Sequence, residues 1–122
     1  MTREEVLAME SGPDMDDHVA EYVMGYLIDR FIFRHNGMEE PCRVWIDAGG
    51  KTHNPRKLST DISAAWKVFD KFEMPELKKW FDPEYDEWYK CSIGNNHISE
   101  RQAPLAICRC ALLSVMEGKD AK

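Results

Sequence analysis

The sequence predicts an α+β domain in which a small antiparallel sheet packs with amphipathic helices in an α-β-α sandwich. Two segments carry this prediction, residues 59–66 and 103–113, because each has a helix-start signal followed by apolar residues at helical spacing. Two further stretches are rich in β-forming residues and end at Gly or Asn turns. We expect a sheet to cover the apolar faces of the helices and one domain to span residues 1–122.

The N-terminal part of the chain contains two predicted helices. Thr2 and Glu5 have the spacing of a capping box, which predicts a short helix that is interrupted at Gly12-Pro13. A longer helix begins at Asp14, whose charge suits a helix N-terminus. Its apolar side chains form one stripe: Met15, Val19, Tyr22, Val23 and Tyr26. This stripe makes it the first main helix of the predicted domain.

Strand and loop signals alternate in the middle of the chain. Residues 27–33 are predicted to begin as helix and continue as strand, and the sequence does not place that boundary. A turn at residues 35–37 precedes a predicted strand at residues 42–47, which ends at an Ala-Gly-Gly sequence. Residues 51–58 contain an Asn-Pro pair and are predicted to form a loop.

The next segment predicts a helix that Ser59 or Thr60 caps and that Met74-Pro75 ends. Ile62, Trp66, Phe69 and Phe72 give this helix its apolar period. Residues 76–80 are predicted to add one more helical turn, and residues 86–93 to form a second strand.

The last predicted helix opens at Ala103, with Pro104 at the first helical position, and ends before Gly118. The polar residues 119–122 that follow are expected to fray. From these periodicities we predict a core that contains Trp66, Phe69, Leu105, Ile107, Leu112 and Val115.

Charge and composition argue against several classes of protein. Sixteen Lys and Arg residues against 22 Asp and Glu residues give a formal net charge of −6, which repels a nucleic-acid backbone. The charged start of the chain resembles no secretory leader, and the longest apolar run, residues 103–116, is too short to span a bilayer and contains Arg109. We therefore expect a cytoplasmic protein without membrane contact, whose four cysteines stay reduced.

No sequence motif indicates a metal site or a nucleophile. The cysteines and histidines contain no C-x-x-C or H-x-x-x-H spacing, and a G-x-S-x-G elbow is absent. We expect no metal, no cofactor and no enzymatic activity, although residues distant in sequence can assemble a catalytic site that this pattern does not reveal.

Four basic residues are the candidate ligand-binding residues. His53, Arg56 and Lys57 lie in a loop without acids that leads into the helix after residue 59, where free amides attract anions; a solvated loop without a ligand is the alternative. Arg109 lies among apolar residues of the last helix. It must either pair with an acid such as Asp61, as a structural residue, or bind an anionic ligand.

Three segments resemble the phage ABA sandwich domain family of small bacteriophage proteins: residues 15–26, 59–66 and 103–111. The resemblance covers most of the chain. It implies a sheet between helical layers in a phage or prophage protein that acts inside a bacterial host, and it implies no catalytic residues. The acidic, aromatic segment at residues 75–88 and His18 depart from the family pattern.

Two functional hypotheses follow for a non-enzymatic phage accessory protein that opposes host defence by binding. In the first, the basic residues grip the phosphates of a small nucleotide signal and an aromatic side chain stacks on its base. In the second, the acidic and aromatic residues 76–87 dock on a basic host defence enzyme. A third hypothesis is a small phosphoester-processing enzyme. Exposed sheet edges and aromatic faces also lead us to expect a homo-oligomer.

Overall fold

The computed structural model describes residues 2–120, with side chains described for residues 2–116. The elements of this part of the chain, in order, are α1 (Arg3–Ala8), α2 (Pro13–Tyr22), β1 (Leu27–His35), β2 (Met38–Ile46), β3 (Thr52–His53), α3 (Ile62–Phe69), β4 (Glu76–Phe81), β5 (Glu87–Ile93), β6 (Asn96–Glu100) and α4 (Ala103–Asp120). In the described residues, no helix is both long enough and apolar enough to cross a membrane.

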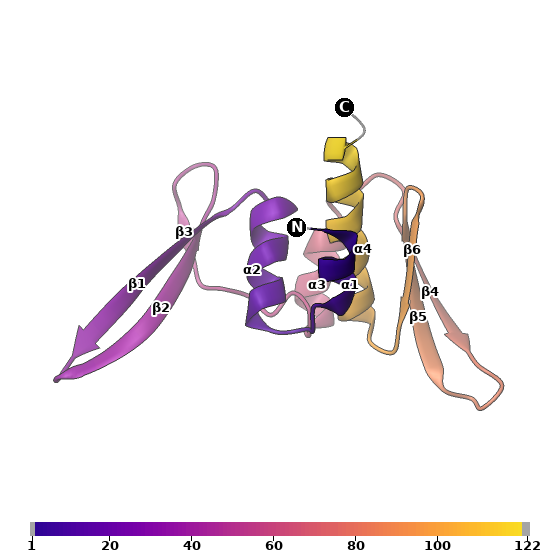
Figure 1. Ribbon diagram of the computed structural model, residues 1–122, viewed down its shortest axis with the longest axis horizontal. Helices are drawn as coiled ribbons and strands as arrows, with labels where there is room; N and C mark the ends of the chain where they lie inside the picture. Colours follow the sequence, from indigo (N-terminus) through magenta and orange to yellow (C-terminus); the bar gives the residue numbers. More distant parts are fainter. Residues whose placement is uncertain (1, 121–122) are drawn as a thin grey trace.

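The strands form two antiparallel sheets, one with the order β1-β2-β3 and one with the order β4-β5-β6. Figure 1 shows the four helices between the two sheets, with the β1-β2 hairpin extending away from them. The predicted α+β class with antiparallel strands is confirmed. The strands, however, lie in two sheets on opposite sides of the helices rather than in one sheet between helical layers.

The core lies where α4 meets the other helices and the sheet β4-β5-β6. Ile107 and Leu112 of α4 are buried there as predicted, and Phe69 and Leu105 pack against the core while partly buried. Val115 is also only partly buried. Together with these residues, the core contains Val6, Met15, Val19, Trp45, Leu58, Val68, Cys91, Ile93, Ile98 and Leu113.

Trp66 is the core prediction that is wrong, because its side chain is 41% exposed. Helix α3 instead turns Ala65 and Val68 into the core. The indole lies on the neighbouring stripe, where its ring meets that of Phe69 edge to face at 5.0 Å. A short helix of mostly apolar residues does not reveal from sequence which side faces inward.

Several element boundaries differ from the predictions. The first main helix ends at Tyr22, and the positive φ of Gly25 (78°) turns the chain into β1, which settles residues 27–33 as strand. The predicted helical turn at residues 76–80 is wrong: it is β4, held by cross-strand pairs such as Leu77 with Cys91. Pairing with a strand further along the chain overrides local propensity there.

Two helix ends also differ from the predictions. Asp61, rather than Ser59 or Thr60, is the N-cap of α3, and its carboxylate accepts a hydrogen bond from the Ser63 amide at 2.9 Å. Helix α4 continues through Gly118 to Asp120, because a glycine ends a helix only where it takes up a left-handed conformation. The rest of the predicted fraying tail, residues 121–122, lies outside the described residues.

None of the four cysteines forms a disulfide, as expected. Cys91, Cys108 and Cys110 are buried, and the Cys108 thiol donates a hydrogen bond to the Leu58 carbonyl at 3.2 Å. Burial raises the pKa of Cys108 far above that of a free thiol. These cysteines therefore act as small core residues rather than as nucleophiles.

Candidate functional site

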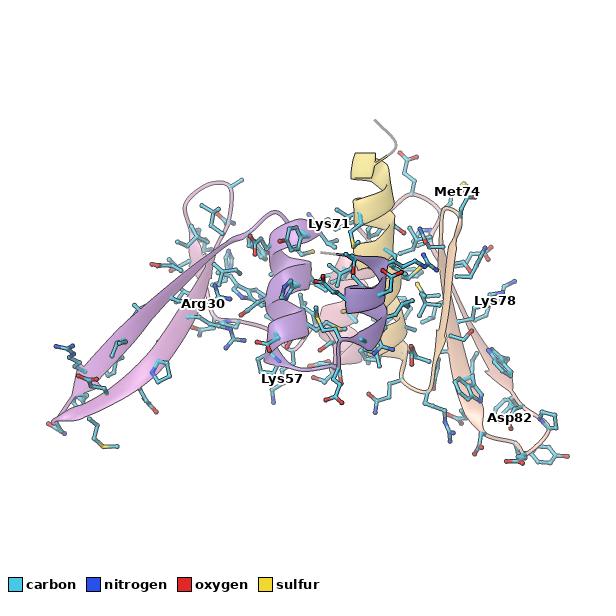
Figure 2. The ribbon with its side chains drawn as sticks, in the orientation of Figure 1. Arg30, Lys57, Lys71, Met74, Lys78 and Asp82 are labelled. Atoms are coloured by element: carbon cyan, nitrogen blue, oxygen red, sulfur yellow. The ribbon has the colours of Figure 1, made fainter. Side chains whose placement is uncertain are left out.

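The main candidate site is a hollow of about 560 Å³ between the start of α2, strand β2 and the loop before α3. We call it the basic hollow, because three of its lining side chains are the cations of Arg43, Arg56 and Lys57. Figure 2 places Lys57 beside the end of α2 at which that helix begins. The other lining residues are Gly12, Pro13, Asp16, Pro41, Cys42, Pro55 and Thr60.

The cations of the basic hollow are available to a ligand. Arg56 and Lys57 are exposed, and neither forms an ion pair with an acid in the described part of the chain. Arg43 donates from Nε to Asp17 at 2.8 Å, which fixes its guanidinium at the wall of the hollow. The free amides at the start of the ten-residue helix α2 add positive potential from the same side.

Asp16 forms the acidic part of this hollow. Its carboxylate is buried and accepts hydrogen bonds at 2.7 Å from both the backbone amide and the hydroxyl of Ser59. Burial raises the pKa of Asp16 above its ordinary value, although the bonds from Ser59 act in the opposite direction. Both contacts tie α2 to the loop that carries Arg56 and Lys57, so Asp16 holds the two walls together.

A second hollow of about 740 Å³ adjoins the first, and its mixed lining includes two aromatic side chains. We call it the aromatic hollow, since Trp66 of α3 and Tyr89 of β5 form part of its wall. Thr60 lines both hollows, and Arg101, two residues before α4, also lines the aromatic one. Helices α2 and α4 begin at the same end of the helical layer, the lower end in Figure 1.

Comparison with known proteins identifies the family. Residues 17–112 match the phage ABA sandwich domain, and they make up most of the chain. The chain belongs to the phage ABA sandwich domain family. A solved structure of a phage protein from Bacillus cereus ATCC 14579 has a TM-score of 0.56, with 22% identity over 88% of this chain and 93% of that chain. This likeness concerns the fold. The comparison with curated proteins gives no match.

In this phage ABA sandwich protein, His53 lies apart from the basic hollow. Its Nε2 is 2.9 Å from the Asp47 carboxylate, and its ring lies 5.6 Å from that of Tyr26. The hydrogen bond from His53 is the main reason why the pKa of Asp47 is lowered. Asp47 also accepts from the amides of Gly49 and Lys51, so this pair fixes the turn between β2 and β3.

Arg109 has the structural environment that was one of its two predicted alternatives. Its guanidinium is mostly buried and donates to the Glu100 carboxylate and, at 2.6 Å, to the Met9 carbonyl. Glu100 therefore takes the place predicted for Asp61, whose carboxylate caps α3. The Arg109 side chain lines a third hollow of about 350 Å³, which shares Arg101 with the aromatic hollow.

Two of the four predicted ligand-binding residues, Arg56 and Lys57, lie together in the basic hollow, whereas Arg43 and Trp66 were not among the predicted residues. Arg43 lies in a strand and Trp66 in a predicted core stripe, so neither carried a local signal for ligand binding. In the described residues, no group of three or more His, Cys, Asp or Glu side chains is arranged to hold a metal ion. The geometry supports recognition of an anion beside an aromatic surface.

Proposed function

We propose that this phage protein binds and sequesters a small nucleotide signal inside the host cytoplasm, without converting it, and so blunts a host defence. The observation that carries the proposal is the junction of the basic and aromatic hollows at Thr60. A nucleotide needs these two environments side by side, since it joins an anionic phosphate to a flat apolar base.

The basic hollow suits the phosphate end of such a ligand. Arg43 offers a planar guanidinium held by Asp17, and Arg56 and Lys57 add two cations without acidic partners among the described residues. Charge-assisted hydrogen bonds to phosphate are about twice as strong as neutral ones. The net charge of −6 disfavours long nucleic acids, so the local cations support a small anionic ligand instead.

The aromatic hollow suits the base. Trp66 is partly exposed and its ring packs edge to face with that of Phe69, so its position is set before a ligand arrives. Tyr89 of β5 also lines this hollow. Stacking of one base on an aromatic side chain contributes about 1–3 kcal/mol. A preformed stacking site costs little ordering entropy, which supports tight retention of the ligand.

Sequestration rather than turnover is supported by the groups nearest to the phosphate site. The Asp16 carboxylate is occupied by two hydrogen bonds from Ser59. Ser59 in turn accepts from the Gly12 amide at 2.9 Å. Neither side chain is free to act as a nucleophile or a base.

Calorimetry against cyclic and linear nucleotides tests the proposal. We expect heat at micromolar protein for at least one nucleotide, and recovery of that nucleotide with unchanged mass after release from the protein. The double variant Arg56→Ala/Lys57→Ala should weaken binding at least about tenfold, which corresponds to about 1.4 kcal/mol. Lys71→Ala is the matched control, because Lys71 is also exposed but lies away from Lys57 in Figure 2.

Two outcomes decide against sequestration. The absence of heat with every nucleotide contradicts nucleotide binding. New products in the mass spectrum after incubation with a nucleotide mixture favour the phosphoester-processing enzyme instead.

A second candidate function, inhibition of a basic host enzyme, is favoured by the tip of the β4-β5 hairpin. Tyr85 is 86% exposed there, next to Glu84 and Asp86. Asp82 fixes the tip, because its carboxylate accepts from the amides of Glu84 and Asp86, both at 2.9 Å, and from the Trp88 indole at 3.2 Å. A rigid acidic tip with a projecting aromatic ring suits a basic protein surface.

Affinity capture from host lysate at low salt tests this second candidate. We expect one basic protein to be retained by the wild type, to be lost in high salt and to be lost with Tyr85→Ala. Retention that is unchanged in Tyr85→Ala would place any partner elsewhere on the molecule.

A further inference from the structure

The β1-β2 hairpin has an apolar face that is largely exposed in the single chain. Residues directly opposite each other in an antiparallel pair share a face, so Leu27, Phe31 and Phe33 lie on the same side as Met38. Their side chains are 69%, 43%, 50% and 72% exposed, in that order. The opposite face of the hairpin is directed to α2, as Figure 2 shows for Arg30. An uncovered apolar face of this kind marks an interaction surface.

The outer edge of this hairpin is also open. Strand β1 stands at the end of the order β1-β2-β3 and contains no proline. Its turn has two residues, Asn36 and Gly37, with positive φ values of 50° and 76°. In such a turn the flanking pair, His35 with Met38, is a hydrogen-bonded pair. The alternate residues of β1 therefore direct their N–H and C=O groups to the open edge: Ile28, Arg30, Ile32 and Arg34.

Charge limits how a second β1 strand can pair with this edge. In an antiparallel pair about a two-fold axis, centring on Arg30 sets that arginine opposite its own copy. Centring on Ile32 sets Arg30 opposite Arg34. Centring on Phe31 sets Arg30 opposite Ile32 and leaves no like charges directly opposite. Like charges at opposed positions destabilise a strand pair, and the register centred on Phe31 avoids them while it pairs all nine residues of β1, so it is favoured.

The remaining charges agree with that register. Arg30 and Arg34 each have an acidic partner within their own chain, Asp17 at 3.4 Å and Glu39 at 3.3 Å, so neither requires a carboxylate from the second copy. Asp29 shares a face with His35 and, in this register, lies diagonal to the second copy's His35, within reach of its ring. The edge of β1 is thus complementary to itself.

We propose that a second copy of this chain pairs with β1 in an antiparallel, two-fold arrangement with Phe31 opposite Phe31, so that the two sheets join into one of six strands. Because Phe31 directs its backbone groups to β2, this central pair lacks mutual hydrogen bonds, and its side chains come closest. The join gives the apolar residues of β1 neighbours on their open side. It also widens a hairpin that is marginal when isolated. This dimer is independent of the nucleotide site.

A charge swap at the two-fold axis tests the pairing. Wild-type protein should have twice the mass of one chain by light scattering at micromolar concentration. Phe31→Asp and Phe31→Lys should each fall two-fold in mass, because they set like charges side by side. An equimolar mixture of the two should return to the dimer mass, since unlike charges then face each other. Leu27→Lys, at the end of β1, is the control and should remain a dimer.

A second pair of variants tests the backbone contacts. Ile32→Pro removes an N–H that the β1-β2 ladder does not use, so it should dissociate the dimer while circular dichroism stays unchanged; Ile32→Ala should leave the dimer intact. A monomeric wild type overturns the proposal. A dimer that persists in Phe31→Lys or Ile32→Pro also overturns it. Should the Phe31 variants fail to fold, the Ile32 pair decides the question. A mixture of folded Phe31 variants that stays monomeric refutes the register.

Discussion

The two sheets of this protein are attached to the same helices by different forces. The sheet β4-β5-β6 presents Cys91, Ile93 and Ile98 to α4, and all three are buried. In the sheet β1-β2-β3, Trp45 is the buried hydrophobic residue among the three strands. Its indole and the guanidinium of Arg43 both donate to Asp17 of α2. The first sheet presents several buried side chains to the core, whereas the second contributes Trp45 and is attached at its base by a polar anchor.

This difference shows how one domain can combine a stable centre with an accessible arm. Burial of apolar area stabilises in proportion to that area, so the sheet β4-β5-β6 shares the stability of the core. A polar anchor holds one end of a hairpin in a defined direction without covering its faces. The uncovered face and edge of β1 are then free for a second chain.

The largest expected effect comes from an isoleucine pair, one in each sheet. Ile93→Ala should lower the free energy of unfolding by about 3 kcal/mol, because it leaves a cavity in the core. Ile32→Ala should lower it by less than about 0.5 kcal/mol, since Ile32 is mostly exposed. Urea titration at a concentration that keeps the chain monomeric measures both. Equal losses would mean that both sheets belong to one core.

The next effect concerns the polar anchor. Asp17→Ala leaves Arg43 and the Trp45 indole without their acceptor, at a cost of about 2–3 kcal/mol. We expect amide exchange to accelerate in β1 and β2 while β5 keeps its protection, because the core of α4 is untouched. Asp14→Ala, at an exposed carboxylate of the same helix, is the control. Uniform acceleration in both sheets would contradict a local anchor.

The helices could be predicted from the sequence because their signals are local. Thr2 accepts from the Glu5 amide as the capping box requires, and Asn36-Gly37 forms the predicted turn. The division into two sheets depends on contacts between distant residues. Strand β4 forms because it pairs with β5, and residues 76–80 alone do not predict that pairing. Strand partners are chosen by the tertiary structure, which explains why one sheet was expected.

The same distinction explains the candidate site. Arg56 and Lys57 were predicted because they stand together in an acid-free loop before a helix. Arg43 reaches the basic hollow from a strand that lies in another part of the sequence. Arg109 was correctly singled out as a cation that needs a partner, but Glu100 comes beside it only when β6 and α4 pack.

The next prediction concerns the pH dependence of stability that arises from Asp16 of α2. The pKa of buried Asp16 is raised above 3.8, so the folded state binds the proton more tightly than the unfolded state. Its contribution to stability is complete below pH 3.8 and is lost as the pH rises through the folded pKa.

Asp16→Asn keeps an acceptor for Ser59 and removes this titration, so its stability relative to wild type should increase as the pH rises above 3.8. Thermal melts across that range measure the difference. The control is Asp47→Asn, because the Asp47 carboxylate of the wild type has the opposite effect on stability. Its pKa is lowered, so its contribution to stability is lost as the pH falls. A constant difference between Asp16→Asn and wild type would contradict the raised pKa.

The smallest expected effect concerns the exposed ion pairs of the two sheets, which test whether surface charge contributes to the different attachment of these sheets. Each sheet carries one exposed ion pair between neighbouring strands: Arg34 with Glu39 at 3.3 Å, and Lys79 with Glu87 at 3.2 Å. Exposed pairs contribute about 0.2–1 kcal/mol, because water screens them and ordering two long side chains costs entropy. Arg34→Gln and Lys79→Gln should therefore change the free energy of unfolding of the monomer by similar small amounts, within about 0.5 kcal/mol of each other. A distinctly larger loss for Arg34→Gln would show that surface pairing, in addition to the Asp17 anchor, holds the β1-β2 hairpin in shape.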